Sequence, residues 1–178
     1  MNGVSIRQIA RAGGSANSSV VAYHFGDKAS LLKAVITHRL PSIDERRRAL
    51  LHAVSGQASD PDLRSLIDAL YRPFFEQKNI MGKRSYAAFV AELVRANEID
   101  VRTSLIADFP ATQDILAQLR HRTGELSPLL FDQRIFLASA LIFAALRQID
   151  QICASDAEND GLFKNAMDAA AAVIGHGI

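Results

Sequence analysis

Apolar residues recur at helical spacing along most of the chain. Leu31, Leu32 and Val35 begin one stripe, and Asp27 stands before them as a helix N-cap. This helix is expected to run to about Val54, with Pro41 kinking or interrupting it. Similar spacing predicts further helices, separated by turn-forming residues, at 63–79, 83–96, 111–122, 128–154 and 158–174. The stretch 97–110 is either a short helix or a loop.

The pattern favours helices over sheet throughout. No long run of Val, Ile, Thr and Tyr alternates at period two, and glycine and proline are few. The sequence therefore predicts an all-α fold. A chain of 178 residues with 49% hydrophobic residues is long enough for one packed body, or for a small head and a body.

Two short helices are predicted near the N-terminus. Ser5 and Gln8 have the spacing of a capping box, so a helix is expected to begin at Ile6 and to end at the pair Gly13-Gly14. Residues 20–25 can form a second short helix after an Asn/Ser-rich turn. Two short helices joined by a glycine turn indicate a helix-turn-helix, whose second helix enters the major groove of DNA.

The charge is unevenly distributed. Residues 1–48 contain eight Lys/Arg and three acidic residues, a net charge of +5, while the remainder has twelve basic and sixteen acidic residues, a net charge of −4. A basic head on a mildly acidic body is typical of a protein whose head meets phosphates. The run Arg46-Arg47-Arg48 is either solvated, paired with acids of the body, or in contact with phosphate.

Other chemistry is sparse. Cys153 is the single cysteine, and the five histidines show no paired metal-ligand spacing, so no metal and no cofactor is expected. There is no glycine-rich phosphate loop, which disfavours the rival interpretation of a helical enzyme. The N-terminus lacks a signal pattern, and no apolar run reaches the roughly 18 residues of a membrane span, so a cytoplasmic protein without membrane contact is expected.

The residue types of the N-terminal segment indicate a protein family more specifically than the helix spacing does. Residues 3–40 resemble the DNA-binding domain of the TetR family of transcription regulators in four pieces: Val4-Ser5-Ile6-Arg7-Gln8-Ile9-Ala10, Ala12-Gly13, Tyr23-His24-Phe25-Gly26-Asp27-Lys28, and Leu31-Leu32. The resemblance implies a helix-turn-helix DNA-binding domain at 1–40 and a helical ligand-binding and dimerisation domain at 41–178. It also implies a homodimer that binds a palindromic double-stranded DNA operator in response to a ligand. Repression is the default function, and activation stays open.

The head departs from the family pattern at its start. Family members normally have another amphipathic helix before the Ser-capped one, whereas only four residues precede Ser5 here. The head is therefore expected to be truncated, with an apolar patch left uncovered. This leaves an alternative function, that of a dimeric helical ligand-binding or interaction protein with the TetR-like fold but without DNA binding.

The motif supplies candidate DNA contacts. Small hydrogen-bonding groups let a helix approach bases or phosphates, and hydroxyl, imidazole and ammonium groups donate to phosphate oxygens. The candidates are Asn17, Ser18, Ser19, Tyr23, His24 and Lys28. Alternatively, the serines are only helix caps, Tyr23 is a half-buried aromatic and His24 a surface histidine. Phe25 and Leu31 are expected in the core.

The body offers a candidate pocket and a candidate dimer interface. Aromatic residues could line an apolar pocket for a small apolar or amphipathic ligand, or could simply form the core; the candidates are Tyr71, Phe74, Phe75, Phe89, Phe109 and Phe136. In the resembling family the last two long helices form a four-helix interface with a partner, and small residues suit that role here, unless they pack only within one chain. The candidates there are Leu141, Ala145, Ile149, Ala169 and Val173. A ligand that favours one arrangement of the body would change the spacing of the two heads.

Overall fold

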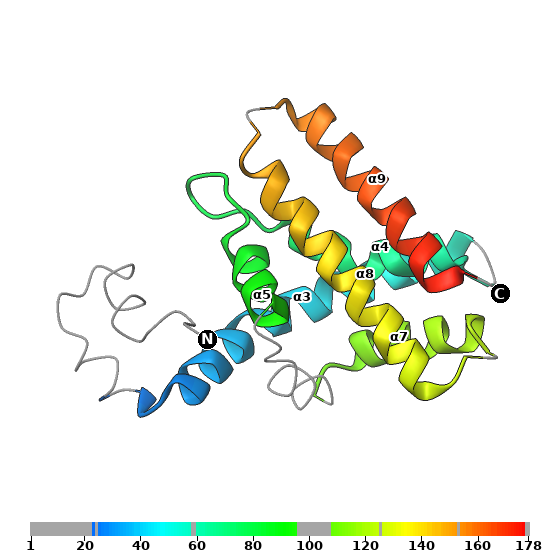
Figure 1. Ribbon diagram of the computed structural model, residues 1–178, viewed down its shortest axis with the longest axis horizontal. Coiled ribbons are helices and arrows are strands. Elements are labelled where there is room, and N and C mark those ends of the chain that lie inside the picture. Colours follow the sequence, from blue (N-terminus) through cyan, green and yellow to red (C-terminus); the bar gives the residue numbers. More distant parts are fainter. Residues whose placement is uncertain are drawn as a thin grey trace.

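The computed structural model describes residues 23, 25–57, 60–95, 108–124, 126–152 and 154–176. Within these ranges the chain forms helices and no strand (Figure 1): α3 (Lys28–Gln57), α4 (Leu63–Glu76), α5 (Ser85–Arg95), α7 (Pro110–Arg122), α8 (Pro128–Ile149) and α9 (Asp156–Gly175). The predicted all-α fold is confirmed. Each of these helices overlaps one predicted segment, and their ends differ from the predicted ones by five residues at most.

The long helix α3 crosses the whole body. The Asp27 carboxylate accepts a hydrogen bond from the Ser30 backbone N–H at 2.7 Å, which is the N-cap predicted from the sequence. Pro41 lies inside the helix and does not interrupt it. Proline removes one intrahelical hydrogen bond, but buried side chains on both sides of it, Leu40 and Ile43, hold the helix against the body. One helix therefore extends across residue 40, where the sequence predicted a domain boundary.

The core surrounds α4. Leu66 and Ile67 are fully buried there, and α4 packs against α3, α7 and α9. Its first turn is capped by Asp62, whose carboxylate accepts from the Ser65 backbone N–H at 2.7 Å. The central apolar cluster joins α4 to α5, α7, α8 and α9. A smaller cluster, formed by Leu32, Ile36, Leu40 and Leu93, fixes the N-terminal half of α3 to α5.

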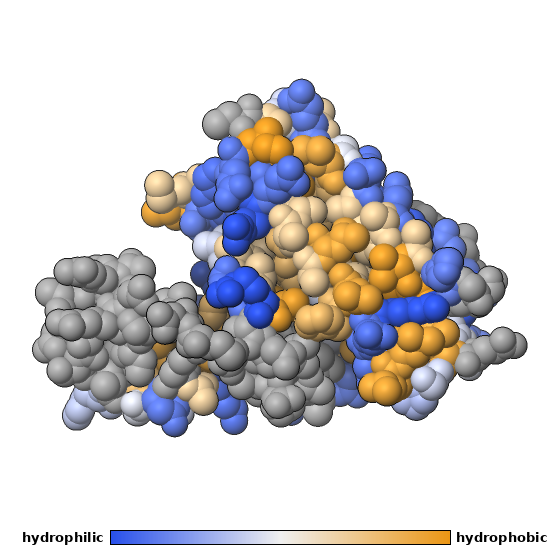
Figure 2. Space-filling view, viewed as in Figure 1, coloured by the Kyte–Doolittle hydropathy of each residue, from blue (hydrophilic) through white to orange (hydrophobic). Residues whose placement is uncertain are grey.

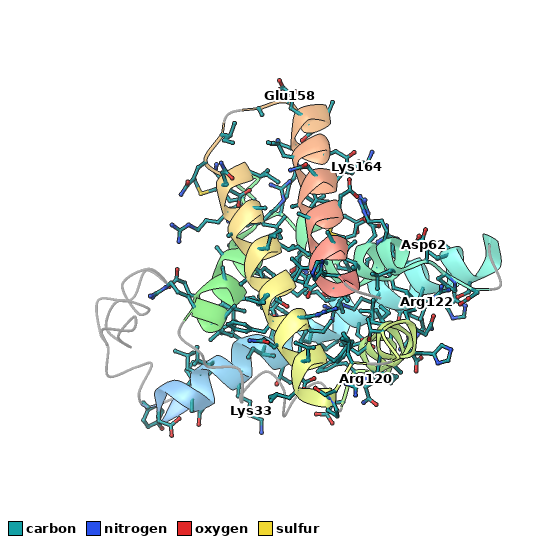
Figure 3. All side chains as sticks on the ribbon, turned by 45° about the vertical axis from the view of Figure 1, so that its right-hand side comes forward. Lys33, Asp62, Arg120, Arg122, Glu158 and Lys164 are labelled. Atoms are coloured by element: carbon teal, nitrogen blue, oxygen red, sulfur yellow. The ribbon has the colours of Figure 1, made fainter. Side chains whose placement is uncertain are left out.

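Helices α8 and α9 form an antiparallel hairpin (Figure 1). Their inner faces contribute Ile142, Leu146 and Met167 to the core. The α9 helix begins with a capping box in which Ser155 and Glu158 bond reciprocally. Glu158 is labelled at this end of α9 in Figure 3. This S-x-x-E signature places the start of α9 two residues before the predicted one.

The outer face of the α8/α9 hairpin is apolar. Figure 2 shows hydrophobic residues gathered over these two helices on the face turned toward the viewer. Leu137 is 48% exposed and Leu162 41% exposed. By length and composition alone α8 could cross a membrane, and 33% of its most apolar window is buried inside the body. A helix this apolar that is only one-third buried leaves surface for a partner to cover.

Candidate functional site

A cavity lies where α3, α4, α5, α7 and α8 meet. Its volume is about 80 Å³. Ten of the side chains around it are apolar: Ile36, Leu40, Leu70, Phe74, Val90, Leu93, Phe109, Leu116, Ile135 and Phe143. Five carry polar groups: Arg47, Tyr71, Tyr86, Thr112 and Ser139. An apolar cavity with a few convergent polar groups is typical of a small-molecule site.

The charged wall of the cavity is Arg47, which is 5% exposed. Its Nε donates to the Leu70 carbonyl oxygen at 2.9 Å, and its Nη1 donates to the Thr112 hydroxyl oxygen at 2.8 Å. Its guanidinium carbon also lies 5.3 Å from the centre of the Phe74 ring, within range of a cation–π interaction. Arg47 thus connects α3 to α4 and α7 at the edge of the cavity.

A buried carboxylate, that of Asp44, holds Thr112 in place on the side away from the cavity. Asp44 accepts from the Thr112 hydroxyl at 2.7 Å, and from the backbone N–H groups of Thr112 at 2.8 Å and Ala111 at 3.2 Å. Because these N–H groups belong to the first turn of α7, the carboxylate of α3 caps that helix and interacts favourably with its dipole. Asp44 does not line the cavity.

A hydroxyl pair forms the other polar part of the wall. The Ser139 hydroxyl donates to the Ile135 carbonyl oxygen at 2.7 Å, as serine often does inside a helix. The Tyr71 and Ser139 oxygens are 2.7 Å apart. Since Ser139 has only one proton, the Tyr71 hydroxyl is the donor of that bond.

The structure brings some of the predicted pocket residues together and not others. Tyr71, Phe74 and Phe109 line the cavity. Phe89 lies behind its wall, stacked on Tyr86 with ring centres 5.8 Å apart. Two lie elsewhere: Phe75 stacks on the Phe163 ring of α9 at 4.4 Å, and Phe136 lines an open groove between α5 and α8.

The predicted dimer residues gather in one place. Leu141, Ala145, Ile149 and Ala169 line a groove of about 390 Å³ between α8 and α9. Val173 is half-buried one helical turn beyond Ala169. Ile149 is buried within the chain, whereas Ala169 is exposed.

Most of the predicted DNA contacts lie outside the described residues: Asn17, Ser18, Ser19 and His24. Tyr23 is 86% exposed, and Lys28 is the first residue of α3. Leu31 is buried as predicted. Phe25 is 38% exposed, so its expected core position is wrong. The left-handed Gly26 (φ 71°) turns the chain between Phe25 and α3, so Phe25 lies outside the helix that packs on the body.

The arginine run proves to have three different environments. Arg46 makes a two-pronged ion pair with Glu76, whose hydrogen bonds raise the pKa of the Arg46 guanidinium. Arg48 pairs with Glu45. Arg47 points inward and is buried, which was not predicted from the sequence. The signal was present, because Ile36, Leu40, Ile43 and position 47 share the spacing of one helix face.

Comparison of the sequence with known proteins identifies no relative of this chain. No protein-family model matches the chain, and no curated protein matches it significantly. Among the described residues there is no group of three or more His, Cys, Asp or Glu side chains that could hold a metal ion.

Proposed function

We propose that the chain is a ligand-responsive, DNA-binding transcription regulator that acts as a homodimer, with repression as its default. Two features support this function. The first is the resemblance of the sequence of residues 3–40 to the helix-turn-helix domain of the TetR family. The second, which carries the proposal, is the path of α3: it begins at Lys28, where the Tyr-His-Phe-Gly-Asp-Lys motif ends, and continues to Arg47 in the wall of the cavity.

This continuity gives ligand binding a mechanical route to the head. Ile36 and Leu40 belong both to the cavity wall and to the apolar cluster that fixes the N-terminal half of α3. A ligand that changes the packing around these side chains changes the preferred position of the helix that leads to the head. A ligand can shift the preferred position of α3 by no more than the difference between its binding free energies for the two arrangements.

The dimer is supported by the outer face of α8 and α9. Leu137 on α8 and Leu162 on α9 are exposed apolar side chains, and Leu162 lines the groove between the two helices. Four alanines also line this groove: Ala144, Ala145, Ala166 and Ala169. Small residues let helices of two chains approach closely, and burial of such a face stabilises association. Two heads related by a two-fold axis reach successive half-sites of a palindromic operator.

The function is tested by selection from a library of fragmented DNA from the source genome, with the full chain as bait. Enrichment of fragments that share an inverted repeat would support a regulator. If no shared sequence is enriched although the protein is folded and dimeric, the regulator proposal is wrong. The alternative, a ligand-binding protein without DNA binding, then replaces it.

A further inference from the structure

We propose that Phe143 is a gate between two parts of one ligand site, the buried cavity and the open groove between α5 and α8, and that the ligand is a linear amphipathic molecule with an anionic end. The apolar chain of the ligand passes Phe143 into the cavity, and the anionic end stays at the rim of the groove. This inference rests on the proposed function, since it describes how a ligand reaches the sensing cavity of the regulator.

The cavity and the groove lie on opposite sides of one layer of side chains. Helices α5 and α8 lie side by side (Figure 1) and contribute adjacent residues to the two linings. On α5, Val90 lines the cavity and Ala91 lines the groove. On α8, Ser139 lines the cavity and Ala140 lines the groove. Among the described residues Phe143 alone lines both spaces, so its side chain separates them.

The Phe143 side chain has room to move. It is 1% exposed, and its ring makes edge-to-face contacts with Tyr71 and Phe74, whose ring centres are 6.1 Å and 5.0 Å away. Empty space on two sides of a ring is unusual in a close-packed interior, and it leaves fewer dispersion contacts to hold the ring. An aromatic residue in a helix has two common positions about its first torsion, so the ring can swing toward the groove without a change of backbone. Such a swing joins the cavity to the groove.

The two spaces together have the size of a small-molecule site. Such sites have volumes of about 300–1,000 Å³. The cavity alone, about 80 Å³, is well below this range, whereas the groove outside it has about 510 Å³. At roughly 30 Å³ per heavy atom, the share of a water molecule in the liquid, the cavity accepts about three carbons. It therefore takes the end of an apolar chain, and the rest of the chain lies along Phe136 and Ala140 in the groove.

The rim of the groove favours an anionic end. The Glu92 carboxylate lies between two guanidinium groups, 2.8 Å from that of Arg95 and 3.6 Å from that of Arg147. The amides of Gln148 and Gln151 complete the polar part of the rim. With two guanidinium groups and one carboxylate, the described part of the rim has one net positive charge and an excess of hydrogen-bond donors. A ligand carboxylate there completes the charge balance and stays in contact with water.

The test is a calorimetric and NMR titration of the full chain with octanoate at neutral pH, without DNA. Intermolecular NOEs are expected from the terminal methyl group of octanoate to Leu116 and Ile135 in the cavity, and from the methylene group beside its carboxylate to Val94 in the groove. Pentanoate, which is shorter by three methylene groups, should bind about fifty-fold more weakly at the usual gain per buried group. Octanamide, the neutral analogue, should bind about threefold more weakly, because exposed ion pairs contribute little.

The association rate tests the gate itself. Phe143→Leu leaves the passage open and should raise the association rate constant by about tenfold or more, because the open position is a minor state of the wild-type protein. NMR line shapes measure this rate. The matched control is Phe163→Leu, which removes the same volume from a buried position outside both linings and should leave the rate unchanged.

A second variant covers the case in which Phe143→Leu does not fold. Ala91→Phe keeps Phe143 and fills the groove from α5, so it should abolish octanoate binding. Ala88→Phe, at a half-buried position of the same helix outside both linings, should not. The proposal would be overturned by NOEs confined to the groove, by an unchanged rate in folded Phe143→Leu, by octanamide binding as tight as that of octanoate, or by unchanged octanoate binding in Ala91→Phe.

The two proposals fail independently. DNA selection by the same preparation without octanoate contacts in the cavity would overturn the gate and the ligand class alone. Octanoate binding past Phe143 without any selected DNA would overturn the regulator alone.

Discussion

Asp44 of α3 bonds twice to Thr112 at the start of α7, once to its backbone N–H at 2.8 Å and once to its hydroxyl at 2.7 Å. The same hydroxyl accepts from Arg47. One threonine side chain therefore lies between a buried acid and a buried base, and it connects two helices at the wall of the cavity.

Thr112→Val should destabilise the protein substantially. It keeps the shape of the side chain but deprives Asp44 and Arg47 of a partner each, and a buried polar group left unsatisfied costs about 1–3 kcal/mol. We expect the free energy of unfolding in urea to fall by about 2 kcal/mol. Ser42→Ala, a hydroxyl deletion at an exposed position of α3, should change the free energy of unfolding by less than about 0.5 kcal/mol. Equal effects of the two variants would contradict this role of Thr112.

Asp150→Asn should lower the free energy of unfolding at least as much as Thr112→Val does, for a different reason. Asp150 at the end of α8 accepts from the Arg84 backbone N–H and from its Nη1, both at 2.6 Å, and Arg84 is 3% exposed. The substitution leaves a buried guanidinium without its ionised partner, which costs about 3–5 kcal/mol. Urea denaturation measures the loss. Lys164→Met removes an exposed i,i+4 ion pair with Asp160 and should cost about 0.5 kcal/mol or less; a comparable loss in both variants would refute the distinction.

The cap of α4 predicts a pH dependence. The hydrogen bond from the Ser65 backbone N–H lowers the pKa of Asp62 below its ordinary value of 3.8. Since the unfolded chain binds this proton more readily than the folded one, the stabilisation by the ionised cap is fully present above pH 3.8 and is lost as the pH falls through the folded pKa. The stability advantage of wild type over Asp62→Asn should therefore shrink on acidification. NMR titration of the Asp62 carboxyl carbon checks the premise, and a midpoint at or above 3.8 would exclude it.

Ala169→Glu should separate the two chains of the proposed dimer. Ala169 is exposed on α9 and lines the groove between α8 and α9, so a carboxylate there is harmless in one chain but would be buried in a dimer interface. Sedimentation equilibrium should give twice the mass of one chain for wild type and the mass of one chain for the variant. Ala157→Glu, an exposed alanine in the first turn of α9 outside the groove, should remain dimeric. A monomeric wild type would contradict the interface.

The sequence predicted the helices well because their apolar spacing and their breaks are local signals. Pro41 shows the limit of such signals, since tertiary packing of Leu40 and Ile43 holds α3 together across a residue that weakens helices. The predicted end of α8 near residue 154 was too late. The helix ends at Ile149, and Asp150 is bound to Arg84, which lies 66 residues earlier in the chain.

The site was less predictable than the fold. Aromatic composition suggested a pocket, and Tyr71, Phe74 and Phe109 do line a cavity, but Phe75 faces α9 instead because adjacent helical residues point in different directions. Arg47 was hidden in a run of three arginines. Only its position on the apolar face of α3 distinguishes it from Arg46 and Arg48, and its partners Leu70 and Thr112 are far away in the sequence.

The most direct test of the account is equilibrium binding of the full chain to DNA from the region upstream of its own gene and to the fragments enriched in the genomic selection, at increasing salt concentration and against random DNA as competitor. A DNA-binding regulator should prefer one of these fragments by about 10³-fold or more, with an affinity that falls steeply as salt rises, because phosphate contacts release counterions. Affinity for all of them no greater than that for random DNA would contradict the account.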